Sequence, residues 1–86
     1  MYEIYSDGAS RSNPGEASVG VSILKDNVEI DTIKKRIGVA TNNVAEYIGL
    51  IEALEYCIKK NITEVIIYLD SLLVFQQVNL EYKVKS

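Results

Sequence analysis

The chain contains no histidine and no tryptophan, and it has a single cysteine, Cys57, and a single proline, Pro14. Without histidine, its side chains can form neither a Ser-His catalytic triad, nor an imidazole general base, nor a His-ligated zinc site. One cysteine can form neither an internal disulfide nor a thiolate zinc site, and it suits a reducing compartment. Any metal that these side chains bind must therefore use oxygen ligands, which favour hard ions such as Mg²⁺ or Mn²⁺.

The sequence also lacks a long apolar run and a signal-peptide pattern, so we expect a cytoplasmic protein with no membrane segment. Its 86 residues suit one domain, 1–86, and a content of 48% hydrophobic and 24% charged residues is ordinary for a globular protein. The net charge of −3 argues against nucleic-acid binding driven by charge alone. Cations bound at a site would weaken that objection.

The apolar pattern predicts an α/β fold with the element order β-β-β-α-β-α. The expected strands cover residues 2–7, 17–23, a charged stretch from 28 to 36, and 64–69, and the expected helices cover 43–60 and 71–80. The first three strands form a meander with a tight turn at Asp26-Asn27. A right-handed crossover then places the fourth strand parallel to the first, which gives a mixed sheet of order 3-2-1-4.

Three carboxylates stand near the ends of these elements. Asp7 ends the first expected strand, Asp70 follows the fourth, and Glu46 lies early in the main helix. Because the first and fourth strands are expected to be parallel neighbours, Asp7 and Asp70 emerge at the same edge of the sheet, where ligands usually bind. The main helix can bring Glu46 over them. The sequence therefore predicts an oxygen-only site for divalent metals.

Each carboxylate also has a purely structural interpretation. Asp7 precedes a glycine, which is a common turn pair, and Asp70 or Ser71 could cap a helix. Glu46 could close a capping box with Asn43 as the N-cap residue.

For Glu46 we favour the functional interpretation. A rotation of about 100° per residue centres the apolar stripe of the helix near Tyr47 and Leu54, with Glu46 on its flank. A carboxylate turned toward the sheet needs a partner such as a cation, because burying it unpaired is strongly unfavourable.

The chain resembles type I ribonuclease H, especially its compact prokaryotic members, because several short motifs occur in the order and spacing of that family. The motifs are Tyr5-Ser6-Asp7-Gly8-Ala9-Ser10-Arg11, Asn13-Pro14-Gly15, Thr41-Asn42-Asn43, Ala45-Glu46-Tyr47, Leu54-Glu55, Asp70-Ser71 and Gln77-Val78. The resemblance covers essentially the whole chain. It implies a ribonuclease H-like fold and a metal-dependent endonuclease that cleaves the RNA strand of RNA/DNA hybrids, leaving 5′-phosphate ends.

The resemblance also implies roles for individual residues. Asp7, Glu46 and Asp70 would be the catalytic metal ligands, holding two Mg²⁺ or Mn²⁺ ions roughly 4 Å apart. The backbone around Ala9 would contact ribose 2′-hydroxyl groups, which distinguish RNA from DNA. The implied contacts to the hybrid are Gly8, Ala9, Ser10, Asn13, Thr41, Asn42, Asn43 and Ser71. The three asparagines have an equally good interpretation as turn or capping residues.

The sequence departs from the family pattern toward its C-terminus. The family's last strand and C-terminal helix are absent, and with them a fourth active-site aspartate, so we expect a C-terminally truncated domain. Leu80 replaces a glycine that ends the second helix in many relatives, so this helix could continue through Glu81. Its apolar circumference and the uncovered edge of the fourth strand indicate a homodimer. The alternative function is a fragment that folds, dimerises and binds metal or hybrid with little or no catalysis.

Overall fold

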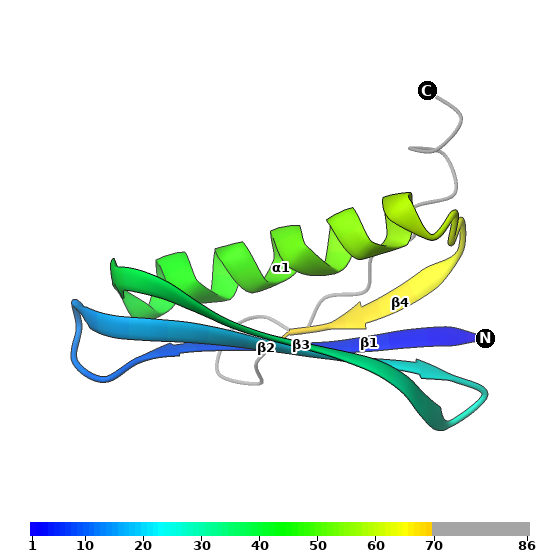
Figure 1. The fold of residues 1–86 in the computed structure, drawn as a ribbon, viewed down its shortest axis with the longest axis horizontal. Coiled ribbons are helices and arrows are strands. Elements are labelled where there is room, and N and C mark those ends of the chain that lie inside the picture. Colours follow the sequence, from blue (N-terminus) through cyan, green and yellow to red (C-terminus); the bar gives the residue numbers. More distant parts are fainter. Residues whose placement is uncertain (70–86) are drawn as a thin grey trace.

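Four strands form one mixed sheet, and a long helix lies across one of its faces (Figure 1). The structure is a computed structural model that describes residues 1–69. Its elements are β1 (Tyr2–Ser10), β2 (Gly15–Lys25), β3 (Val28–Ala40), α1 (Asn42–Lys59) and β4 (Val65–Tyr68). The strand order is β3-β2-β1-β4, with β1 antiparallel to β2 and parallel to β4. The predicted sheet is confirmed, whereas the second predicted helix, 71–80, lies outside the described residues.

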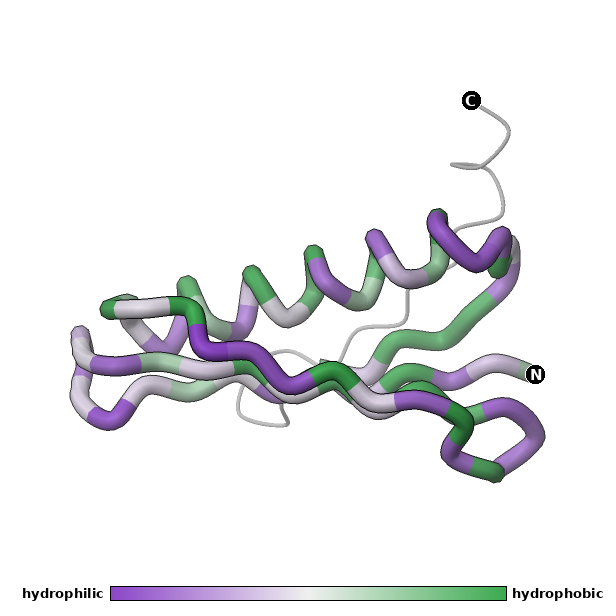
Figure 2. The backbone as a smooth tube through the Cα atoms, viewed as in Figure 1, coloured by the Kyte–Doolittle hydropathy of each residue, from purple (hydrophilic) through white to green (hydrophobic). Residues whose placement is uncertain are grey.

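The tight turn between β2 and β3 forms where the sequence predicted it. Asp26 and Asn27 have positive φ angles of 50° and 67°, the left-handed conformation that a two-residue hairpin turn requires and that Asp and Asn tolerate well. The following strand, β3, is an edge of the sheet and is exposed along most of its length. Figure 2 shows a hydrophilic stretch in its middle, as expected for an edge that must not pair with other molecules.

β1 is longer than the sequence predicted. The expected end of this strand at Asp7 is wrong, because β1 continues to Ser10, which pairs with Ala17, and only residues 11–14 lie between the strands. The glycine that indicated a turn, Gly8, has a different structural role. A Cβ atom at Gly8 would lie 2.3 Å from the carbonyl oxygen of Ala45, so this glycine allows the helix backbone to approach the strand.

α1 packs on the sheet through small residues. Its buried positions are Ala45, Glu46, Gly49, Ala53 and Cys57, a helical stripe that small side chains allow to lie close to the strands. Our prediction that the stripe centres near Tyr47 and Leu54 is wrong for Tyr47, whose side chain is 66% exposed, whereas Leu54 is partly buried and packs against the core. Figure 2 shows hydrophobic segments on the side of α1 that faces away from the sheet.

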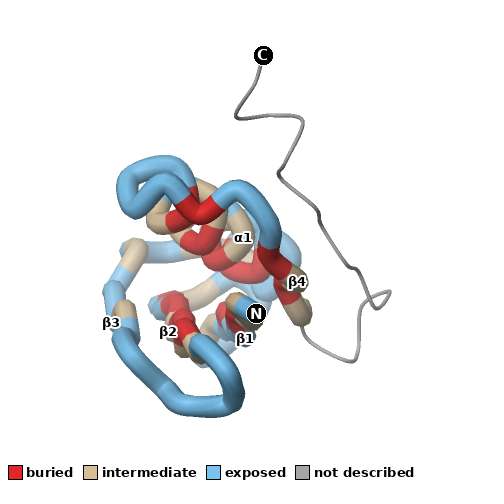
Figure 3. Tube along the Cα trace, turned by 90° about the vertical axis from the view of Figure 1, so that its right-hand side faces the viewer, coloured by how far each residue is buried: buried red, intermediate tan, exposed pale blue. Residues whose placement is uncertain are grey.

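The core lies between α1 and the sheet (Figure 3). Its largest fully buried side chains are Ile4, Ile23, Ile67 and Cys57. Burial raises the pKa of the Cys57 thiol to about 11, so the thiol stays protonated near neutral pH and packs as a small apolar group. Within residues 1–69, no helix is both long and apolar enough to cross a membrane.

A tight contact between Ser6 and Gly49 provides a test of this packing. Among the described residues, the buried Ser6 Oγ atom has no hydrogen-bond partner, and a Cβ atom at Gly49 would lie 2.5 Å from it. Gly49→Ala should therefore lower the free energy of unfolding by about 1–3 kcal/mol.

Ser6→Ala removes that oxygen and leaves the nearest atoms 3.8 Å or more from the new methyl group. The double variant Ser6→Ala/Gly49→Ala should be at least as stable as wild type, because alanine favours a helix over glycine by about 1 kcal/mol. Urea unfolding of the four proteins measures this coupling. Simple additivity of the two single changes would contradict the contact.

Candidate functional site

Side chains of helix α1 accept hydrogen bonds from the backbone of β1 where β1 does not pair with β4. The parallel ladder with β4 covers only the first part of β1, and the later N–H groups point toward the helix instead. Gly8 N donates to Glu46 Oε1 at 2.8 Å, and Ser10 N donates to Asn42 Oδ1 at 2.9 Å. Because Asn42 and Glu46 are four residues apart, they lie on one face of α1. Two helix side chains thus take the place of a neighbouring strand.

Glu46 lies in the middle of the buried side of α1 and is only 6% exposed. The N-cap residue is Thr41, whose Oγ1 accepts a hydrogen bond from Val44 N. Glu46 is five residues beyond the cap, so the capping box with Asn43 is wrong, since that motif requires the acid three residues beyond the cap. A buried carboxylate needs strong donors, and the Gly8 amide is one of them.

Asp7 is exposed and precedes Gly8 in β1. The alternation of the strand turns Ser6 and Gly8 toward the helix, while Asp7 and Ala9 face the open side of the sheet. Three residues of β1 follow Asp7, so our prediction that it ends the strand is wrong. Two of the three predicted positions are nevertheless adjacent, because the Glu46 carboxylate accepts a hydrogen bond from the amide of Gly8, the residue after Asp7.

The third predicted ligand, Asp70, and its neighbour Ser71 lie outside the described residues. The last pair of the parallel ladder joins Tyr5 to Tyr68, and each predicted aspartate is two residues further along its chain segment. Among residues 1–69, no three His, Cys, Asp or Glu side chains are close enough together to hold a metal ion. Asp7 and Glu46 supply only carboxylate oxygens, which suit Mg²⁺ or Mn²⁺, and a third ligand would come from beyond Leu69.

The side chains predicted to contact nucleic acid are joined to one another at the start of α1. Asn42 N donates to Asn13 Oδ1 at 3.0 Å, and Asn42 Oδ1 also accepts from Ser10 Oγ at 3.0 Å. Thr41 caps the helix, and Asn43 is exposed. The structural interpretation of Asn13 and Asn42 is thereby supported, since they fix the loop after β1 to the helix. Their contact with nucleic acid stays a prediction.

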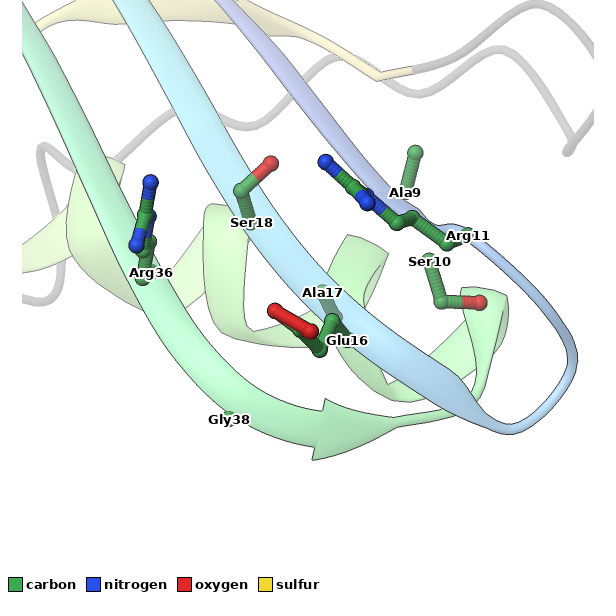
Figure 4. Close-up of a pocket in the computed structure, with 8 residues that line it drawn as sticks. All are labelled: Ala9, Ser10, Arg11, Glu16, Ala17, Ser18, Arg36 and Gly38. Carbon is green, nitrogen blue, oxygen red and sulfur yellow. The ribbon is translucent and has the colours of Figure 1, made fainter.

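A group of cations on the open face of the sheet was not predicted from the sequence. Two adjoining hollows lie there, of about 340 and 500 Å³. The first is lined by Ala9, Ser10, Arg11, Glu16, Ala17, Ser18, Arg36 and Gly38 (Figure 4). The second is lined by Asp7, Ala9, Ser18, Val19, Gly20, Lys34, Lys35 and Arg36. The available signal was the alternation of Lys34 and Arg36 along β3, opposite small residues of β2.

Comparison with known proteins gives a consistent result. A family model described as RNase H matches residues 1–85. The bifunctional protein Rv2228c of Mycobacterium tuberculosis is 43% identical over 84 residues, which are 95% of this chain and 23% of that protein. Ribonuclease HI of Halobacterium salinarum is 45% identical over 74 residues, which are 85% of this chain and 37% of that protein. The chain thus spans well under half the length of these two relatives.

Solved structures share the fold. RNase H1 from Halobacterium salinarum superposes with a TM-score of 0.77 at 41% identity, covering 81% of this chain and 54% of that one. LC11-RNase H1, whose structure is a complex with an RNA/DNA hybrid, superposes with a TM-score of 0.75 at 37% identity, covering 86% of this chain and 58% of that one.

Two glycines of the sheet test how closely the helix must approach β1. At Gly8 a methyl group would meet the backbone of Ala45, which cannot turn away, whereas at Gly20 nothing lies within 4 Å. Gly8→Ala should lower the free energy of unfolding by about 3 kcal/mol or more, because it displaces α1 and breaks a buried hydrogen bond. Gly20→Ala should be neutral or stabilising by about 0.5–1 kcal/mol. Equal stability of the two variants in urea would contradict this account.

Proposed function

Because the chain belongs to the ribonuclease H family, we propose that it is a metal-dependent endonuclease that hydrolyses the RNA strand of RNA/DNA hybrids. The observation that carries the proposal is the buried Glu46 carboxylate, held by the amide that follows Asp7. Burial of a carboxylate lowers the stability of the fold, so stability alone does not explain a glutamate at this position. The hybrid bound to the relative LC11-RNase H1 supports the choice of substrate class.

In this proposal, Asp7, Glu46 and Asp70 hold two Mg²⁺ or Mn²⁺ ions. When bound, such ions supply the positive charge that activates a water molecule and stabilises the leaving oxygen. The chain's own contribution is positioning. The Gly8 N–H fixes one oxygen of Glu46, and the packing of Gly8 against Ala45 keeps that carboxylate away from bulk water. Asp7 stays open to solvent, where a nucleic-acid strand can approach it.

The residues around this pair are proposed to bind the hybrid. The backbone of Gly8, Ala9 and Ser10 would contact ribose hydroxyl groups of the RNA. The network of Asn13 and Asn42 would hold that segment of β1 in a fixed position, since it ties Ser10 to the start of α1. Thr41, Asn43 and Ser71 complete the proposed contacts.

A second candidate is a protein that folds and binds metal or hybrid but cleaves poorly. In either case we propose a homodimer formed through β4, which pairs on only one side within residues 1–69. The proposed location, the cytoplasm, stays a prediction.

Cleavage of a hybrid with labelled RNA, assayed on monomer and dimer fractions separated by size, tests the proposal. Wild type should cut the RNA strand in Mg²⁺ or Mn²⁺ and leave a DNA duplex intact. Asp7→Asn and Glu46→Gln should each lower the rate by about a hundredfold or more, because each removes a charge that balances the metal ions. Glu46→Gln should keep Tm close to wild type, since its amide oxygen can still accept from Gly8 N.

Glu55→Gln is the matched control, because Glu55 is an exposed carboxylate elsewhere on α1; its rate should equal that of wild type. Hybrid binding without cleavage at millimolar Mn²⁺ would favour the second candidate. Cleavage of DNA duplex but not of hybrid, or full activity of Asp7→Asn, would contradict the leading one.

A further inference from the structure

The open face of the sheet carries long cationic side chains opposite very small ones. In the register of β2 and β3, Arg36 pairs with Ser18 and Lys34 pairs with Gly20. All but Gly20 are exposed, and this glycine is half-buried. Because no element of residues 1–69 covers this face (Figure 1), the small residues of β2 form a floor with cations along one side.

The two hollows of this face form one continuous trough. Both are lined by Ala9, Ser18 and Arg36, so they meet over Ser18 of β2. Asp7 lines only one end and Arg11 only the other. Figure 4 shows the Arg11 side chain extending toward Ser18, with Arg36 on the other side of that serine. The trough therefore begins at a carboxylate of the proposed metal site and leads between two guanidinium groups.

Three of the four cations that line the trough are not used by the described part of the chain, because among them only Lys35 is paired. The two ion pairs of this part join the N-terminus to Asp26 and Lys35 to Glu52, and the side chains of Arg11, Lys34 and Arg36 make no hydrogen bond within residues 1–69. Glu16 and Asp7 also line the trough, so three available cations face two carboxylates. In a chain of net charge −3, an excess of unpaired positive charge beside an active carboxylate indicates an anionic ligand.

We propose that this trough binds the sugar-phosphate backbone of a single nucleic-acid strand that extends from Asp7 toward Arg11. Two guanidinium groups flanking a serine hydroxyl match the oxygens of a phosphate, which arginine binds in a bidentate manner. The trough spans three adjacent strands, about 10 Å, a width that suits one backbone and resembles the charged grooves that track single strands. The choice of nucleic acid as the ligand rests on the proposed function, whereas the phosphate chemistry does not.

This inference is tested by measuring the binding of a labelled single-stranded oligoribonucleotide in a buffer that contains EDTA, which removes divalent metal ions and so prevents cleavage. The variant is Arg11→Gln/Arg36→Gln, and the control is Lys59→Gln/Lys60→Gln, which makes the same change of net charge at the far end of α1. The trough variant should raise Kd about tenfold or more. It should also reduce the slope of log K against log salt by about 1.4, the value for two lost phosphate contacts on a single strand. The control should leave both values unchanged, and all four substituted side chains are exposed, so Tm should be unaffected.

Equal weakening by the two variants would overturn the inference, because it would show a general effect of charge. Inorganic phosphate or a mononucleotide that binds as tightly as the oligonucleotide would also overturn it, because the site would then hold one phosphate and not a strand. The proposed function is tested separately. If the wild-type protein cleaves hybrid and the trough variant binds the strand as tightly as wild type, only this inference is contradicted. If the protein binds the strand through the trough but does not cleave hybrid, only the proposed nuclease activity is contradicted.

Discussion

The hydrogen bond from Gly8 N to Glu46 Oε1 joins the sheet to the helix where β1 has run past β4. At this point the sheet would otherwise expose unpaired backbone groups to a buried environment, which is unfavourable. A carboxylate is a stronger acceptor than a neutral carbonyl oxygen, so one side chain satisfies the strand and places a carboxyl group next to the residue that follows Asp7. The remaining features of the structure follow from keeping Glu46 in that place.

The close approach of α1 is the first consequence. The carboxylate of Glu46 reaches β1 only if the helix backbone lies almost against the strand, which requires Gly8 below it and Gly49 above Ser6. The helix therefore fully buries mainly alanine and glycine, and its larger apolar side chains are only partly buried or exposed. The hydroxyl of Ser6 is left without a partner among the described residues. Such a buried polar group lowers stability, which is what one expects beside a site selected for function.

Much of the fold was predictable from the sequence, because alternation and turn chemistry are local signals. The hairpin at Asp26-Asn27, the charged edge strand and the order 3-2-1-4 all follow from them. The buried side of α1 was not predictable, because hydrophobic periodicity assumes that large apolar residues face the core. Here the short distance between helix and strand determines which residues are buried, and it favours Gly49 over Tyr47. The length of β1 was missed for the same reason, since Gly8 was interpreted as a turn residue.

The candidate site was predicted in part. Sequence motifs identified Asp7 and Glu46, yet the role of the Gly8 amide depends on a contact between residues far apart in the chain. The cations of the open face were also missed, since Arg11 and Arg36 line the same hollow only once β1, β2 and β3 lie side by side. Charge counted over the whole chain pointed away from nucleic acid, whereas the charges that line the trough point toward it.

Glu46 and Asp7 are proposed to share a divalent metal around Gly8. Titration of ¹⁵N-labelled protein with substoichiometric Mn²⁺ tests it most directly, because the paramagnetic ion broadens the amide signals nearest to it. The account predicts that the signals of Asp7, Gly8 and Glu46 broaden first, and that Glu46→Gln weakens this effect without moving it elsewhere. Broadening that begins at the exposed acids near the other end of α1, with Gly8 unaffected, would contradict the account.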